Sequence, residues 1–256
     1  ETPEQVAALV ADLRARSPRL LVAVDEEGGD VTRLHYRTGS PYPGNAVLGR
    51  IADTDVTRAE AARIGADLRA AGIDLDLAPS LDVNSAPDNP VIGTRSFGAD
   101  PALVARHGAA WVDGLQSAGV LACVKHFPGH GATTADSHHA LPVVDEPLEV
   151  VRSRELLPFR GSRASCAMVA HVVVPALDPD VPATFSRRIV TEVLRGELGF
   201  EGAVISDALD MAGASGTIGI PQAAVRALVA GNDLLAVDDG QVDADGEVTV
   251  TDAFRY

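Results

Sequence analysis

The residues best suited to chemistry are concentrated in one stretch, residues 125–139, which holds one lysine, four histidines and one aspartate. It follows a short apolar run, residues 119–124, that predicts a buried strand. Pro128 and Gly129 interrupt that strand, because neither residue continues a β-ladder well. A buried strand that ends in charged groups and enters a loop rich in glycine and histidine indicates a site for chemistry rather than for packing.

Asp136 and His138 are the candidates for proton transfer within this stretch. A carboxylate two residues from a histidine can accept a hydrogen bond from one imidazole nitrogen, which fixes the tautomer. The other nitrogen is then left to exchange protons near neutral pH. A solvated polar loop is the alternative interpretation of the same residues.

A third candidate, Asp207, directly follows the apolar run 202–206. It could act as a nucleophile or base, or it could cap a helix or accept structural hydrogen bonds.

Four further side chains could bind hydroxyl, carboxylate or phosphate groups, namely Arg33, Arg95, Lys125 and His126. The last two are the stronger candidates, because they end a strand that otherwise has core composition.

Metal chemistry and a serine hydrolase triad are less well supported. No His-Glu-x-x-His motif is present, and Pro128 and Gly129 prevent His126 and His130 from sharing a helix face. No Gly-x-Ser-x-Gly elbow is present either. We therefore expect neither a metal ion nor a cofactor.

Composition narrows the classes of partner. The net charge of −15 argues against nucleic acid, whose phosphates require a basic surface. Cys123 and Cys166 both lie in apolar runs and are interpreted as two buried thiols. No run reaches the roughly 18 apolar residues of a membrane span, and no signal peptide is present. The chain begins at Glu1, so the sequence leaves localisation open between the cytoplasm and export; oligomeric state has no visible signature.

Strand-like and helix-like segments alternate along the chain, which predicts a parallel α/β fold. The expected strands are 20–24, 73–78, 119–126, 164–174, 202–206 and 233–237. The expected helices are 4–16, 57–71, 101–118, 146–160, 186–198 and 221–230. No Gly-x-Gly-x-x-Gly follows the first strand, which disfavours a dinucleotide-binding sheet.

Polar residues at the ends of the strands favour a (β/α)8 barrel, since a barrel brings all carboxyl ends of its strands to one face. These residues are Asp25, Asp82, Lys125, His126, His171 and Asp207. The first predicted helix precedes every predicted strand, so we expect an incomplete barrel whose first strand lies before residue 1. We interpret residues 1–237 as a single domain and residues 238–256 as an acidic tail of unassigned structure.

The segment Lys125-His-Phe-Pro-Gly-His-Gly131, followed by Ala135-Asp-Ser-His138, resembles the signature of glycoside hydrolase family three, in its NagZ-type β-N-acetylglucosaminidase branch. Four other segments resemble the family in the same order, 24–29, 91–98, 170–173 and 205–211. The resemblance implies a single (β/α)8 barrel and a retaining exo-β-N-acetylglucosaminidase. The expected substrates are small peptidoglycan- or chitin-derived carbohydrate fragments.

The resemblance also implies roles for individual residues. Asp207 would be the nucleophile that forms a covalent glycosyl-enzyme, and His138, paired with Asp136, would be the general acid and then the general base. Retaining glycosidases usually give both roles to carboxylates. The positions that would hold the terminal N-acetylglucosamine are Asp25, Arg33, Arg95, Lys125 and His126. One departure is Asp30, where the family pattern has arginine.

Several alternatives stay open on the sequence alone. A family-three β-glycosidase of other sugar specificity would take its acid/base from a second domain, and Asp136 and His138 in this one argue against it. A phosphorylase of the same branch, in which phosphate replaces water, is not distinguished by sequence. A non-catalytic sugar-binding relative would not need a nucleophile together with an acid. A metal enzyme of another class is the most remote option.

Overall fold

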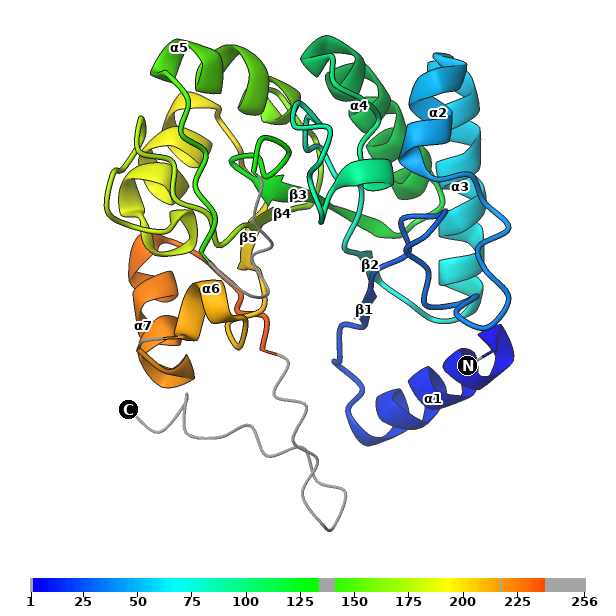
Figure 1. The fold of residues 1–256 in the computed structure, drawn as a ribbon. Helices are drawn as coiled ribbons and strands as arrows, with labels where there is room; N and C mark the ends of the chain where they lie inside the picture. The colour runs from blue at the N-terminus through cyan, green and yellow to red at the C-terminus, as the bar shows by residue number, and fades with distance from the viewer. Residues whose placement is uncertain (1, 134–140, 217, 238–256) are drawn as a thin grey trace.

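The structure is a computed structural model that describes residues 2–133, 141–216 and 218–237. Five parallel strands form one sheet in this part of the chain, in the order β1-β2-β3-β4-β5. Their bounds are Ala23–Val24, Leu75–Asp76, Leu121–Phe127, Cys166–Val169 and Ala203–Ser206. The sheet curls into half a barrel with helices on both sides of it (Figure 1). The predicted incomplete (β/α) barrel is therefore confirmed.

Helices separate the strands, as the alternating pattern predicts. The α-helices are α1 (Pro3–Arg16), α2 (Asn45–Ile51), α3 (Thr54–Ala70), α4 (Pro101–Ser117), α5 (Leu148–Val150), α6 (Ala212–Ser215) and α7 (Ile220–Ala230). Two π-helical segments are η2 (Val151–Glu155) and η5 (Arg188–Glu197), and three short 3-10 turns are η1 (Gly93–Arg95), η3 (Leu157–Phe159) and η4 (Ala183–Phe185). Among the elements of the described residues, the short helices α2 and α6 and the 3-10 turns η1 and η4 fall outside the predicted ranges.

Side-chain caps begin the long helices. Thr2 and Gln5 form a reciprocal capping box at the start of α1. The carboxylates of Asp53 and Asp100 accept hydrogen bonds from backbone N–H groups in the first turns of α3 and α4. Helices α3 and α4 then pack side by side (Figure 1). These local signals fix where the three helices start.

The outer strands are shorter than the apolar runs predict. The run 20–24 yields only β1, and Leu21 is 52% exposed rather than buried. The reason is that β1 lies at one edge of the described sheet, where no described strand pairs with its outer side. At the other edge, the predicted strand 233–237 contributes a single parallel bridge between Ile205 and Leu234.

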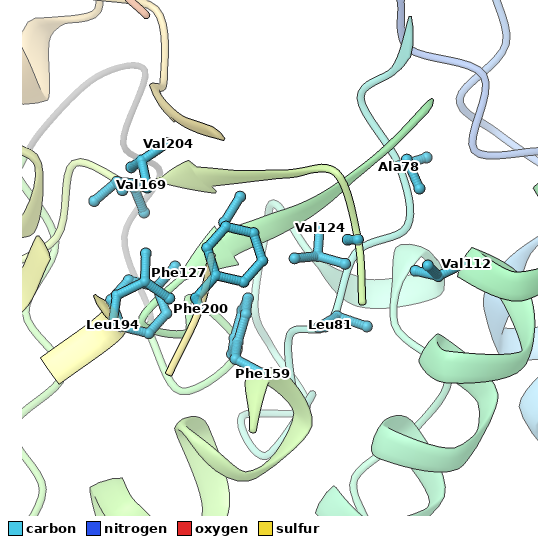
Figure 2. Packing of buried hydrophobic residues seen from close by; sticks show 14 of the residues in the cluster. Ala78, Leu81, Val112, Val124, Phe127, Phe159, Val169, Leu194, Phe200 and Val204 are labelled. Carbon is cyan, nitrogen blue, oxygen red and sulfur yellow. The ribbon is translucent and has the colours of Figure 1, made fainter. Parts of the chain in front are cut away.

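The main core lies between the sheet and the helices. Phe127 and Phe159 meet edge to face with ring centroids 5.2 Å apart, and Phe200 and Leu194 lie beside them (Figure 2). Edge-to-face packing is a favoured arrangement for aromatic pairs. Phe127 immediately follows His126 on β3, so the packing of its ring anchors the strand end that carries the predicted site residues.

The two cysteines are both buried, as predicted, but they are not two thiols. Cys123 on β3 and Cys166 on β4 are register partners on adjacent strands and form a disulfide. The prediction of free thiols is wrong because sequence alone does not give the register of strands 43 residues apart.

Gly131 allows the loop after β3 to approach the chain after β2. A Cβ at this position would lie 1.9 Å from the carbonyl oxygen of Val83. Backbone cannot rotate away as a flexible side chain can, so we expect Gly131→Ala to lower the free energy of unfolding by about 3 kcal/mol. Urea unfolding measures this change. Gly196→Ala is the matched control, since its Cβ would make only an ordinary contact of 3.5 Å; equal effects of the two substitutions would contradict the prediction.

Candidate active site

The carboxyl ends of the strands surround a cavity of about 450 Å³. Every predicted site residue within the described ranges lines it, namely Asp25, Arg33, Arg95, Lys125, His126 and Asp207. Asp136 and His138 lie outside the described residues. Apolar side chains from Leu77, Val91, Met168 and Met211 complete part of the wall. The cavity therefore combines several charged groups with apolar surface, which is typical of a small-molecule site.

Asp207 directly follows β5 and faces this cavity. Its Oδ1 accepts a hydrogen bond of 2.8 Å from the backbone N–H of Ala208. Burial raises the pKa of Asp207, but the nearby His126 and His171, together with the Ala208 N–H, hold the pKa below its ordinary value. The carboxylate is therefore ionised at neutral pH, as a nucleophile must be.

His171 supports the backbone beside Asp207. The sequence placed it among the strand-end residues of the open face, but its ring is fully buried and does not line the cavity. Its Nε2–H points at the carbonyl oxygen of Ala208, 2.9 Å away. Burial lowers the pKa of His171, which favours the neutral ring. The residue thus holds the peptide that follows Asp207.

Lys125 and Arg95 are held by a carboxylate that is not among the predicted site residues. Glu27 is 2% exposed and contacts Lys125 Nζ at 2.7 Å and Arg95 Nη2 at 2.7 Å. Burial raises the pKa of Glu27, but the two cations outweigh that effect and lower the pKa to about 2. Lys125 Nζ also contacts Asp25 Oδ1 at 2.5 Å. Burial lowers the pKa of Lys125, yet Glu27 and Asp25 outweigh it and raise the pKa, so the amine stays charged.

An alternation rule could have identified Glu27. Residues i and i+2 of an extended segment point to the same side. Asp25 and Glu27 follow β1 in this relationship, and both contact Lys125. The intervening Glu26 points elsewhere and accepts backbone N–H groups from Arg33 and Leu34. Glu26 thereby shapes the turn that brings Arg33 to the mouth of the cavity.

The departure at Asp30 lies beside the cavity rather than in it. Arg33 lines the cavity, whereas Asp30 is exposed and lines a smaller neighbouring hollow of about 150 Å³. The Thr94 hydroxyl donates to Asp30 Oδ2 at 2.7 Å, which joins the loop after β1 to the turn η1. The aspartate that replaces the arginine of the family pattern is therefore held at the rim of the cavity.

Asn89 supports the loop that leads from β3 toward the predicted proton-transfer residues. It is buried, and its side-chain amide donates to the carbonyl oxygens of His130 (2.9 Å) and Thr133 (3.0 Å). Its Oδ1 accepts the backbone N–H groups of Val91 and Ile92. One amide thus joins two loops that both line the cavity. Within the described ranges, no group of three or more His, Cys, Asp or Glu side chains is arranged to hold a metal ion.

Glu155 is a buried carboxyl group behind the same loop. Its side chain packs against Gly129, where a Cβ would lie 2.6 Å from Glu155 Oε2. Arg154 Nε donates to Oε1 at 2.6 Å, but Oε2 has no hydrogen-bond partner among the described residues. Burial raises the pKa of Glu155 to about 7, and the contact with Arg154 only partly offsets this effect.

Glu155 should therefore make stability depend on pH. Its folded pKa of about 7 exceeds the ordinary 4.5, so the folded chain binds more protons between these values. The contribution of Glu155 to the free energy of unfolding is complete below about pH 4.5 and is lost as the pH rises through about 7. We expect Glu155→Gln to gain up to about 3 kcal/mol over the original protein between pH 5 and pH 8, measured by urea unfolding. The exposed Glu149→Gln should show no such change. A pH-independent difference for Glu155→Gln would contradict the assignment.

The sequence matches the family description "Glycosyl hydrolase family 3 N terminal domain" over residues 1–251. It is 40% identical to beta-hexosaminidase A of Pseudoalteromonas piscicida over 84% of this chain and 39% of that protein. It is 42% identical to a beta-hexosaminidase of Alkalilimnicola ehrlichii over 92% of this chain and 70% of that protein.

The fold is also shared with solved structures. A glycoside hydrolase family 3 beta-N-acetylglucosaminidase from Paenibacillus sp. str. FPU-7 superposes with a TM-score of 0.89 and 46% identity, over 93% of this chain and 47% of that one. The chain thus spans less than half the length of two of these relatives and about two thirds of the third. Its sequence, its curled parallel sheet and its cavity at the strand ends together show that the chain belongs to glycosyl hydrolase family 3.

Proposed function

We propose that this chain carries the catalytic site of a retaining exo-β-N-acetylglucosaminidase. The observation that carries the proposal is the meeting of an ionised Asp207 with Asp25, Arg95, Lys125 and His126 around one cavity. Relatives about 40% identical are beta-hexosaminidases, and a similar structure is a beta-N-acetylglucosaminidase. The proposed substrates are terminal N-acetylglucosamine residues of peptidoglycan- or chitin-derived fragments.

In the first proposed step, an oxygen of Asp207 attacks the anomeric carbon and forms a covalent glycosyl-enzyme. The glycosidic bond breaks at the same carbon, and the departing oxygen takes a proton from His138. In the second step, His138 removes a proton from water, the water oxygen attacks the anomeric carbon, and the carboxylate of Asp207 is released. Asp136 would hold the His138 ring. The roles of Asp136 and His138 rest on the sequence signature.

The charged side chains around the cavity suit a polyhydroxylated ligand. Lys125 and Arg95 are fixed in place by Glu27, so they can donate hydrogen bonds to sugar oxygens without first losing side-chain freedom. Asp25 is part of the same network and can accept from hydroxyl groups. Met168 and Met211 offer apolar surface to the sugar ring. This combination favours a neutral sugar over a highly charged ligand.

Hydrolysis of an aryl β-N-acetylglucosaminide tests the proposal. We expect the protein to release the aryl alcohol and free N-acetylglucosamine, and to act poorly on the matching aryl β-glucoside. Absence of release from the N-acetylglucosaminide would refute the proposed function. A second assay adds inorganic phosphate, because formation of N-acetylglucosamine 1-phosphate would reassign the protein as a phosphorylase.

The acid role of His138 has its own test. His138→Ala should lower kcat/KM most for substrates whose leaving group is a poor one, since a good leaving group needs no proton. A series of aryl N-acetylglucosaminides with different phenol acidities measures this dependence. An equal loss across the series would remove His138 from the acid role.

A further inference from the structure

Asp82 is a buried carboxylate directly behind the cavity, and the proposed reaction leaves it without a role. It lies on the chain after β2 and is fully buried. Unlike its neighbour His126, it does not line the cavity. Its Oδ2 lies 2.6 Å from Nδ1 of His126. The same carboxylate accepts from the backbone N–H of His130 at 2.7 Å and from the hydroxyl of Ser80 at 2.8 Å.

The charge of Asp82 decides which nitrogen of His126 carries a proton. Burial raises the pKa of Asp82, but the contact with His126 and the N–H of His130 outweigh this and hold the pKa well below its usual range. An ionised carboxylate only accepts hydrogen bonds. Nδ1 of His126 must therefore be the donor in the 2.6 Å contact.

The other ring nitrogen of His126 faces a donor. Nε2 lies 3.3 Å from Nη2 of Arg95, a residue that lines the cavity. A guanidinium only donates hydrogen bonds, so Nε2 is the acceptor of this pair. The contacts on both sides of the ring thus select a single neutral tautomer, protonated at Nδ1 and unprotonated at Nε2.

We propose that Asp82 is a positioning residue, which fixes the His126 ring with Nδ1 protonated so that Nε2 is presented to the cavity as a hydrogen-bond acceptor. The single lone pair of Nε2 accepts from Arg95 in this structure; on the proposed function, a hydroxyl of the bound sugar takes the place of Arg95 as the donor to Nε2. Without Asp82, the proton could move to Nε2, and the ring would then present a donor beside the Arg95 guanidinium. Two donors facing each other would turn the ring or displace Arg95.

The first test reads the tautomer directly and needs no enzyme activity. Nitrogen-15 NMR of the histidine rings distinguishes a protonated nitrogen from an unprotonated one. We expect His126 in the unmodified protein to be protonated at Nδ1 only, and Asp82→Asn to lose this preference. Ser80→Ala is the matched control, since it removes a donor to Asp82 without touching His126, and it should leave the tautomer unchanged. A His126 ring protonated at Nε2 alone in the unmodified protein would overturn the proposal.

The second test asks whether Asp82 acts through His126. We expect Asp82→Asn to lower kcat/KM about 10- to 100-fold, the loss that is typical when the partner that orients a metal-binding histidine is removed. The double variant Asp82→Asn/His126→Gln should be no worse than His126→Gln alone, because the two residues form one unit. Losses that multiply would show that Asp82 acts elsewhere and would overturn the proposal.

These tests separate the new inference from the proposed function. A protein with the expected His126 tautomer but no N-acetylglucosaminidase activity would refute the function and leave the role of Asp82 intact. An active protein whose His126 tautomer does not respond to Asp82→Asn would refute the role of Asp82 alone. If Asp82→Asn does not fold, the spectrum of the unmodified protein still decides the tautomer.

Discussion

Asp207→Ala is expected to lower kcat/KM for an aryl β-N-acetylglucosaminide by at least about 1,000-fold, because the variant has no nucleophile to form the glycosyl-enzyme. The ionised carboxylate lines the cavity, and its Oδ1 is held by the backbone N–H of Ala208. Asp210→Ala is the matched control, because Asp210 also lines the cavity three residues further along. It should retain far more activity than Asp207→Ala.

A slow fluorosugar substrate locates the nucleophile independently of rates. Mass spectrometry of the trapped protein should find the sugar on the peptide that contains Asp207. The adduct should be absent from Asp207→Ala and present in Asp210→Ala. A sugar attached to another carboxylate would reassign the nucleophile, and comparable rates for the two variants would show that Asp207 does not form the covalent bond.

The site residues at the ends of strands could be predicted from the sequence for a simple physical reason. Lys125, His126 and Asp207 each follow an apolar run, and a charged group at such a position has no packing role. In a parallel barrel these ends must meet on one face, so their convergence in space followed from topology. The structure places all three at the cavity.

The supporting residues were harder to predict because their roles depend on which strands are neighbours. The sequence marks Asp82 only as a strand-end residue and does not mark Glu27. Their partners at the end of β3, Lys125 for Glu27 and His126 for Asp82, lie far along the chain. The prediction that the two cysteines are free thiols failed for the same reason, since their pairing depends on strand register. The exposure of Leu21 depends on β1 being an edge of the described sheet, which an apolar run does not reveal.

The second large effect is expected at Glu27, on stability as well as activity. Glu27→Gln keeps the shape of the side chain but leaves Arg95 and Lys125 without their shared counter-charge in a buried setting. Removing the charge of one partner of a buried ion pair costs several kcal/mol. Lys125 still has Asp25 as a second counter-charge. We therefore expect the free energy of unfolding to fall by about 3 kcal/mol at pH 7, measured by urea unfolding. We also expect kcat/KM to fall, because both cations line the cavity.

The pH dependence distinguishes this ion-pair effect from a packing effect. The folded pKa of Glu27 is about 2, below the ordinary 4.5, so its stabilising contribution is complete above about pH 4.5 and is lost as the pH falls toward 2. The difference between Glu27→Gln and the unmodified protein should therefore shrink below pH 4.5. Glu192→Gln, which breaks an exposed pair with Arg187, should cost about 0.5 kcal/mol or less at pH 7. A cost at Glu27 that is equally small, or that persists unchanged at pH 3, would mean that Glu27 does not hold the two cations in place.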